Sequence, residues 1–507
     1  MPTLESLTWL NRFVSETPGD SEIGGRSRQV PNACWSRVVP SPSPNAQMRM
    51  WSSEMAERLG VEYGGAETLG GGKPVAGMDP YAQRYGGHQF GNWAGQLGDG
   101  RAITLGEIES AHGVLELQLK GAGKTPYSRF ADGKAVLRSS IREFLCSEAM
   151  HHLGVPTTRA LSLVTSGEDI LRDIMYDGNP AHEPGAIVCR IAPSFIRFGS
   201  FQIHTATGDV ATLRTLVEHT VRSHFPNHSV KDDAGRIAWL SQVAEDTALM
   251  VAHWMRVGFV HGVMNTDNMS IHGLTIDYGP YGWLEDYNPG WTPNTTDSST
   301  RRYRYGQQPQ IAAWNLARLL ESLVPLMDEP ELLHGVLDAY TDAFDVHHNK
   351  MWAEKLGLEH FTEDDESLVR ELNALLQEVE TDMTIFFRLL CQIASPDVRY
   401  LLHAFYDTET VPTEAWNAWL NRWWSRVSGE PVRTSMLQAN PKYVLRNWMA
   451  QLAIDAAHKG DYSVCEQLHS MLKQPYDEQP EHDEQWFQKR PEWARSKVGC
   501  SMLSCSS

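Results

Sequence analysis

Asn268 and Asp277 are two oxygen-donor residues on neighbouring segments of the chain. The amide oxygen of asparagine and the carboxylate of aspartate are hard ligands, of the kind that Mg²⁺ and Mn²⁺ prefer. A metal held between them would neutralise phosphate charge in a transfer reaction. Either residue alone is more often an ordinary turn residue, so the assignment depends on their spacing and on the residues around them.

The spacing is that of a protein-kinase catalytic loop, which reads H-R-D-x-x-x-x-N with D-F-G downstream. Asn268 follows His261 by seven residues, and Asp277 opens an Asp-Tyr-Gly sequence. The kinase base would fall at position 263, but Val263 has no carboxylate. Asp267, beside the metal ligand, either polarises a hydroxyl or braces the loop. The sequence therefore predicts a cleft for a nucleoside triphosphate and a metal, without a base in the kinase position.

Two further features match such a cleft. The run Gly98-Asp-Gly-Arg101 opens a predicted hairpin, where glycines let the backbone approach a phosphate or ribose and Arg101 adds a cation. Alone this run is an everyday turn. Lys120 and Glu143 come in the order of the kinase Lys–Glu ion pair, and an exposed surface lysine is the alternative.

Two groups of residues have no counterpart in the kinase pattern. Asp132-Gly133 follows the basic stretch Lys124–Arg129, and Arg190 and Arg197 flank a mostly apolar run. Arginine forks suit bidentate phosphate contacts. A structural ion pair is an equally good interpretation of these arginines.

The elements that must position these residues follow from hydrophobic periodicity. In the second strand of a hairpin, Leu115, Leu117 and Leu119 alternate with polar residues, which places Lys120 away from the buried face. The predicted hairpin strands are Arg101–Ile108 and Val114–Lys120, and further strands are predicted at Arg159–Val164 and Ala186–Ile191. Helices are predicted at Met48–Leu59, 134–153, Asp209–Phe225 and Ala234–Val257, and from Gln310 to about His469.

This order, strands first and helices second, predicts an α+β fold in which a small sheet lobe lies on a larger helical lobe. We expect an N-terminal extension at 1–95, the sheet lobe at 96–205, the helical lobe at 206–473 and a tail at 474–507. The tail is expected to dock through Trp486 and Trp493.

The composition is globular, with 41% hydrophobic and 21% charged residues among 507. A net charge of −19 disfavours nucleic acid as a partner. No apolar run approaches the length of a membrane span, and the N-terminus has no secretory pattern. The seven cysteines are scattered without C-x-x-C spacing, which disfavours structural zinc and favours a reducing cytoplasm. A monomer is the default expectation.

Long strings in the chain resemble the selenoprotein O (YdiU) family of protein-kinase-like pseudokinases. The resemblance covers nearly the whole length. Its strongest carriers are Tyr85–Arg101, Leu117–Gly133, His261–Met269, the run Asp277-Tyr-Gly-Pro-Tyr-Gly and the terminal Ser504-Cys-Ser-Ser.

The resemblance implies a kinase-like bilobal fold and transfer of AMP from ATP to Ser, Thr or Tyr hydroxyls of proteins, with Mg²⁺ or Mn²⁺. The nucleotide would lie flipped relative to a kinase, so that the α-phosphate meets the acceptor. Asp267 matches the proton acceptor, and Asn268 and Asp277 match the metal ligands, with Asp277 also close to the nucleotide. Arg190 and Arg197 match phosphate-contacting arginines. The other matching nucleotide-contacting positions are Gly98, Gly100, Arg101, Lys120, Asp132 and Gly133.

Some members of the family pair a cysteine of the activation segment with one near the C-terminus. Here residues 277–301 contain no cysteine, and the tail has Cys500 and Cys505. A Cys500–Cys505 or intermolecular bridge and free thiols both stay open. Two functions other than AMP transfer also stay open: a kinase that moves the γ-phosphoryl group, which Val263 disfavours, and a pseudokinase that only binds nucleotide.

Overall fold

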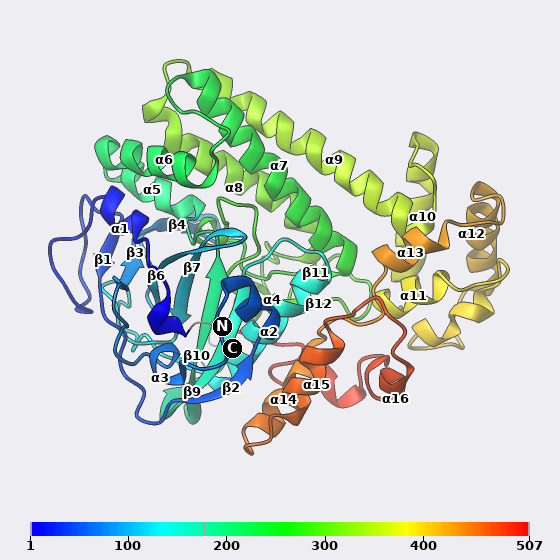
Figure 1. Ribbon diagram of the computed structural model, residues 1–507. Coiled ribbons are helices and arrows are strands. Elements are labelled where there is room, and N and C mark those ends of the chain that lie inside the picture. The colour runs from blue at the N-terminus through cyan, green and yellow to red at the C-terminus, as the bar shows by residue number, and fades with distance from the viewer. Residues whose placement is uncertain (1–2, 176–177, 505–507) are drawn as a thin grey trace.

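The computed structural model describes residues 3–175 and 178–504, with strands concentrated before residue 193 and helices after it (Figure 1). An eight-stranded antiparallel sheet has the order β1-β3-β6-β7-β10-β9-β2, with β8 paired to β10. Its strands are β1 (Trp35–Arg37), β2 (Gln47–Trp51), β3 (Tyr81–Gln83), β6 (Ala102–Ser110), β7 (Gly113–Lys120), β8 (Ala135–Val136), β9 (Arg159–Arg172) and β10 (Ala181–Ala192). The predicted hairpin is thus confirmed as β6 and β7.

Two small sheets lie outside this one. The hairpin of β4 (Gly86–Gln89) and β5 (Asn92–Gln96) forms the first, and β11 (Phe259–Val260) with β12 (Gly282–Trp283) forms the second. Because β1, β2 and β3 belong to the main sheet, the segment before residue 96 is hydrogen-bonded into the same sheet as the later strands. The four-part division of the chain stays a prediction.

Helix α4 (Leu137–His152) packs against β9 and β10. Leu137, Ile141, Phe144 and Leu145 recur at helical spacing and are all buried. The helix confirms the prediction for 134–153. Its polar side is also covered, because Glu143 is only 3% exposed, and this burial already separates Glu143 from an ordinary surface glutamate.

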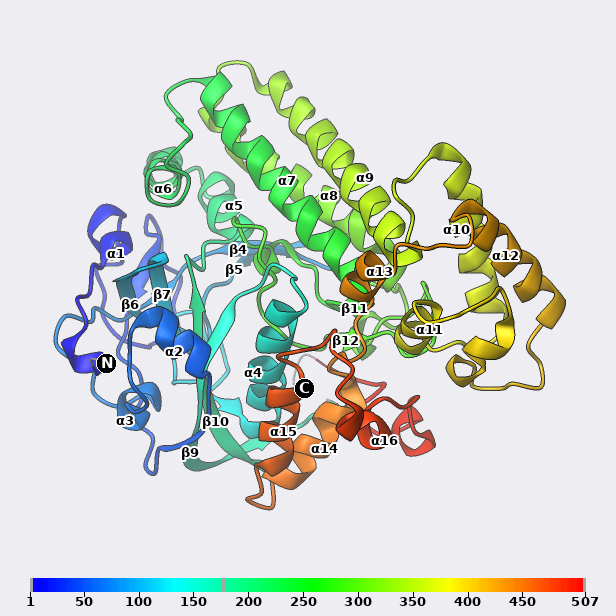
Figure 2. The same cartoon turned by 45° about the vertical axis from the view of Figure 1, so that its right-hand side comes forward.

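The rest of the chain is largely helical. In Figures 1 and 2, the long helices α7, α8 and α9 lie side by side on one side of the sheet, and α10 and α12 lie at the end farthest from it. The helices after α4 are α5 (Phe198–Ala206), α6 (Val210–His224), α7 (Asp233–Val257), α8 (Gln308–Leu323), α9 (His334–Leu356), α10 (Glu363–Glu378), α11 (Met383–Leu390), α12 (Thr413–Arg426), α13 (Arg433–Ala439), α14 (Asn447–Ala457), α15 (Ser463–Met471) and α16 (Asp483–Trp486). Three short helices precede α4, namely α1 (Arg12–Glu16), α2 (Ser53–Leu59) and α3 (Ala66–Leu69).

One buried cluster joins the two halves. It contains Ile141 of α4, Val188 of β10, Phe201 of α5 and Trp239 of α7. Burial of such large apolar side chains is the main stabilising term for a domain of this size. This shared core therefore fixes how the sheet and the helices are placed relative to each other.

Three expectations need correction. The predicted helix Met48–Leu59 is helical only from Ser53, because Gln47–Trp51 pairs with β9 at the edge of the sheet and tertiary pairing overrides the local pattern. Lys120 does not lie on an open face, because it is 8% exposed and both sides of β7 are covered. In the tail, Trp486 is buried as expected, whereas Trp493 is 42% exposed.

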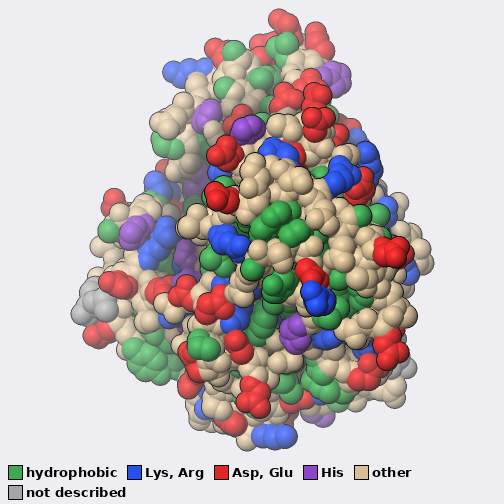
Figure 3. Space-filling view, turned by 90° about the vertical axis from the view of Figure 1, so that its right-hand side faces the viewer, with side chains coloured by type: hydrophobic (Ala, Val, Ile, Leu, Met, Phe, Trp, Pro, Cys, Tyr) green, Lys and Arg blue, Asp and Glu red, His purple; other side chains and the backbone are tan. Residues whose placement is uncertain are grey.

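In the described part of the chain, no helix is long and apolar enough to cross a membrane. Cys500 is a buried free thiol, whereas Cys505 lies outside the described residues. On the face shown in Figure 3, acidic and basic side chains are interspersed rather than gathered into a basic stripe.

Candidate active site

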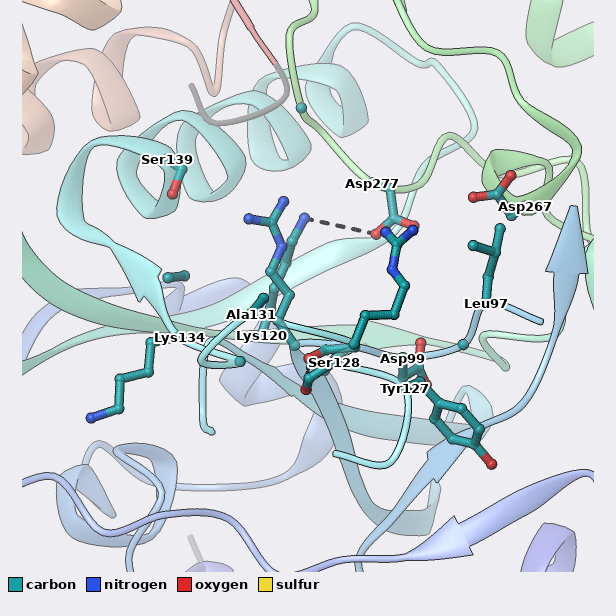
Figure 4. Close-up of a pocket in the computed structure, with 18 of the residues that line it drawn as sticks. Leu97, Asp99, Lys120, Tyr127, Ser128, Ala131, Lys134, Ser139, Asp267 and Asp277 are labelled. Carbon is teal, nitrogen blue, oxygen red and sulfur yellow. Dashed lines mark hydrogen bonds and ion pairs between the residues drawn. The ribbon is translucent and has the colours of Figure 1, made fainter. Parts of the chain in front are cut away.

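A cavity of about 810 Å³ contains the polar residues singled out from the sequence. Figure 4 shows Asp267 and Asp277 toward one side of it and Lys134 toward the other. The predicted site residues that line it are Gly98, Gly100, Arg101, Lys120, Asp132, Gly133, Arg190, Asp267, Asn268 and Asp277. Arg197 is the exception, and it reaches the site through a contact with Asp277.

Asp277 is the centre of a group of cations. Arg190 Nη1 lies 2.5 Å from its Oδ1, Arg197 Nη1 lies 2.5 Å from its Oδ2, and Lys120 Nζ lies 3.7 Å from Oδ1. Desolvation alone would raise the pKa of Asp277, but the charges of these three cations hold it well below its usual range. The carboxylate is therefore ionised at neutral pH. Arg190 and Arg197 therefore form structural ion pairs, as one of the two interpretations of the sequence predicted.

Lys120 is the last residue of β7, and its ammonium lies 2.6 Å from Glu143 Oε2 on α4. The other oxygen of Glu143 accepts a hydrogen bond of 3.1 Å from Arg190 Nη1. The Lys–Glu contact expected from the kinase order is therefore present. Buried cations of this kind are stable only with acidic partners, and a polyanion that entered the cavity could compete for them.

Asp99, between the two glycines of the predicted turn, completes the floor of the cavity. Its Oδ1 lies 3.8 Å from Arg197 Nη2, and its Oδ2 accepts from the main-chain amide of Gln83 and from Gln118 Nε2. Gln118 also accepts from Arg190. The two glycines were predicted from the sequence as part of the site, whereas Asp99 and Gln118 were not. The alternation of residues along β7 nevertheless places Gln118 on the same face as Lys120.

Close packing requires glycine at two positions that line the cavity. A Cβ at Gly98 would lie 2.4 Å from the ring of Tyr127, and one at Gly133 would lie 2.1 Å from the carbonyl oxygen of Gly123. Gly133 also has a φ of +72°. Asp132 beside it forms two 2.8 Å hydrogen bonds with Arg172, so its carboxylate already has a partner.

Asp267 lies in a 3-10 turn, Thr266–Asn268, and is buried. Its Oδ2 accepts a 3.2 Å hydrogen bond from Gln89 Nε2, and its Oδ1 has no partner among the described residues. Burial raises the pKa of Asp267 to about 6, and the hydrogen bond from Gln89 and the charge of Arg197 offset this only in part. A carboxylate without a cation on it, with a pKa close to neutral, has the properties of a general base.

Asn268 is held by its amide nitrogen, which donates to the carbonyl oxygen of Val263 at 2.9 Å. Its side-chain oxygen accepts no hydrogen bond from the described residues and remains available as a ligand. Among those residues, no group of three or more His, Cys, Asp or Glu side chains could hold a metal ion. A cation here would have Asn268 and Asp277 as protein ligands, and these are hard oxygen donors that fit Mg²⁺ or Mn²⁺.

Comparisons with known proteins identify the family of this chain. The model of the family described as protein adenylyltransferase SelO matches residues 24–473. The chain is 53% identical to the protein nucleotidyltransferase YdiU of Aromatoleum aromaticum, over 99% of this chain and 100% of that protein. It is 52% identical to the protein of the same name in Flavobacterium johnsoniae, over 99% and 100%, and 54% identical to that of Xanthomonas axonopodis pv. citri, over 99% of each. The chain therefore belongs to the SelO family of protein adenylyltransferases.

Proposed function

We propose that this chain transfers AMP from ATP to Ser, Thr or Tyr hydroxyls of proteins, with ATP flipped in a kinase-like cleft. The observation that carries the proposal is one cavity that holds two chemically distinct groups. Lys120 and Arg190 supply positive charge around Asp277, and Asp267 supplies a buried carboxylate that has no ion pair among the described residues.

The proposal assigns phosphate binding to Lys120, Arg190 and Arg197. Their present partners are carboxylates of the protein, and phosphate oxygens match the same guanidinium and ammonium donors. The other proposed nucleotide contacts are Gly98, Gly100, Arg101, Asp132 and Gly133. Because Val263 lines the cavity where a kinase has its base, the arrangement favours transfer at the α-phosphate over transfer at the γ-phosphate.

Asn268 and Asp277 would hold Mg²⁺ or Mn²⁺. The metal would supply charge neutralisation at the phosphates. For Asp277 to serve as a ligand, its arginine contacts must loosen, and phosphates that engage Arg190 and Arg197 provide those arginines with other acceptors.

Asp267 would accept the proton of the acceptor hydroxyl. The hydroxyl oxygen then bonds to the α-phosphorus, and the bond from that phosphorus to the oxygen bridging the α- and β-phosphates breaks. Pyrophosphate leaves, and AMP stays on the acceptor as a phosphodiester. The raised pKa of Asp267 suits this role, because a base near the working pH takes a proton more readily than a strongly acidic carboxylate does.

The kinase-like fold belongs to this proposal. The order of Lys120, Glu143, Asn268 and Asp277 along the chain, and the contact between the first two, support a sheet lobe at 96–205 and a helical lobe at 206–473. In this division, residues 1–95 would be an extension on the core and 474–507 a tail.

The test is transfer of label from ATP to protein. The chain is incubated with ATP labelled at the α- or the γ-phosphate, with Mg²⁺ or Mn²⁺, and with casein as a generic acceptor. Protein-bound label from α-labelled ATP alone is the expected result. Label only from the γ-position would establish kinase chemistry instead, and nucleotide binding without any transfer would establish a non-catalytic binding protein.

A further inference from the structure

The β4–β5 hairpin holds the loop that carries Asp267. The main-chain amide of His88 donates to Thr266 Oγ1 at 2.7 Å, and that of Phe90 donates to Asn265 Oδ1 at 3.2 Å. Between these two residues, Gln89 donates to Asp267. Three consecutive residues of the hairpin thus bond to three consecutive residues of the loop, although about 175 positions separate them in the chain.

In the described part of the chain, Gln89 is the only side chain that donates a hydrogen bond to the Asp267 carboxylate. It also lines the cavity, as its neighbour Phe90 does. On the other side of the carboxylate, a Cβ placed on Gly87 would lie 2.4 Å from Asp267 Oδ1. The carboxylate therefore lies between a donor and a residue that leaves it space only because it is glycine.

This contact matters because the last torsion of an aspartate is soft, with a broad range of accessible angles. A base that rotates freely spends much of its time out of line with the hydroxyl that it must deprotonate, and small misplacements of reacting groups are costly. One donor on Oδ2 and close packing at Oδ1 together fix the plane of the carboxylate.

We propose that Gln89 is a positioning residue for the transfer reaction, which orients Asp267 toward the acceptor hydroxyl. The inference rests on the proposed function, in which Asp267 is the base. Gln89 makes no hydrogen bond to Lys120, Arg190 or Asn268 in the described structure, so we expect its replacement to slow the acceptor step more than it weakens nucleotide binding.

Gln96 provides a matched control within the same hairpin. Its side chain accepts from the main-chain amide of Val30 at 2.8 Å and donates to the carbonyl of Arg28 at 2.9 Å. It does not line the cavity. Gln96→Ala therefore removes hydrogen bonds that anchor the hairpin without touching Asp267.

The experiment measures transfer of α-label to casein, and ATP affinity, for wild type, Gln89→Ala, Gln89→Glu and Gln96→Ala. A hydrogen bond to a charged group corresponds to about a 10- to 100-fold change in rate, so kcat should fall by that factor in Gln89→Ala. ATP affinity should stay within about twofold. Gln89→Glu keeps the length and loses the donor, so it should be at least as slow. Gln96→Ala should keep kcat within about twofold, since it acts only on the anchor of the hairpin.

Unchanged kcat in Gln89→Ala, or an equal loss in Gln96→Ala, would overturn the inference. If wild type transfers no α-label, the proposed function fails, and hydrogen–deuterium exchange then decides on the contact itself. Faster amide hydrogen exchange of residues 261–270 in Gln89→Ala than in Gln96→Ala would support a stabilising contact between Gln89 and this loop. Equal exchange in the two variants refutes it.

Discussion

Asp277 neutralises two buried arginines, so its replacement by asparagine should have opposite effects on stability and on affinity for metal-free ATP. Arg190 and Arg197 are 3% and 1% exposed at their side chains, and each has its shortest carboxylate contact, 2.5 Å, with Asp277. Removing one partner of a buried ion pair typically costs about 3–5 kcal/mol. Here the cost should be lower, because Arg190 keeps Glu143 at 3.1 Å and Arg197 keeps Asp99 at 3.8 Å.

We therefore expect Asp277→Asn to lower the free energy of unfolding by about 2–3 kcal/mol. For a chain of 507 residues this corresponds to a fall of about 2–3 °C in Tm, because the entropy of unfolding is about 2.1 cal/mol/K per residue. The two arginines then lack an acceptor that ATP phosphates can supply. At an effective dielectric of about 20, removing one negative charge roughly 10 Å from a phosphate is worth about 1.7 kcal/mol, or about 15-fold in affinity.

The assay is thermal unfolding with and without ATP in excess EDTA, together with a direct titration of ATP. A matched control is Asp382→Asn. Asp382 is fully buried and contacts Arg446 twice at 2.8 Å, while Arg446 keeps Glu285, so the control should lose comparable stability without a change in ATP affinity. If Asp277→Asn bound metal-free ATP no more tightly than wild type, the arginines would not be phosphate ligands. AMP transfer should be lost in Asp277→Asn with metal present, because the neutral amide oxygen that replaces the carboxylate is a weaker metal ligand.

Three further predictions concern neighbouring residues. Burial raises the pKa of Asp267 to about 6, and only the ionised carboxylate accepts a proton, so the kcat for AMP transfer should fall about tenfold per pH unit below about pH 6. A pH–rate profile tests this, and a flat profile between pH 5 and 7 would contradict it. Lys120→Met should weaken ATP binding, measured by titration, and leave Glu143 with Arg190 as its remaining cation; unchanged affinity would place the phosphates elsewhere. Gly133→Ala should raise the KM for ATP several-fold, because its Cβ would meet the Gly123 carbonyl at 2.1 Å and displace the loop; an unchanged KM would show that the loop does not touch ATP.

The sequence predicted those parts of the site that depend on local spacing or on order along the chain. The meeting of Asp267, Asn268 and Asp277 in one cavity and the contact of Lys120 with Glu143 follow a known pattern of residue types, and the hairpin and α4 follow simple periodicity. Helix α5 escaped prediction because it has Gly199 at its second position and is buried nearly all round, so it has no amphipathic stripe to detect.

The missed residues share a different cause. Gln89, Asp99 and Gln118 matter through partners that the fold brings together from distant segments, and no local period encodes such pairs. Gln89 was visible only as one letter of a Gly- and aromatic-rich stretch. Its contact with Asp267 depends on how the β4–β5 hairpin packs against residues 265–267, which is a property of tertiary packing.

The position of the proposed base and the role of the N-terminal segment are connected. In the kinase pattern the base lies two residues after the histidine, and here that place is Val263, whose carbonyl oxygen instead holds Asn268. The proposed base, Asp267, directly precedes that asparagine in the chain and accepts a hydrogen bond from Gln89 of the β4–β5 hairpin. The hairpin ends at Gln96 and precedes the segments that match the kinase order. With the proposed base at Asp267, residues 86–96 provide contacts to the loop that the kinase pattern does not include.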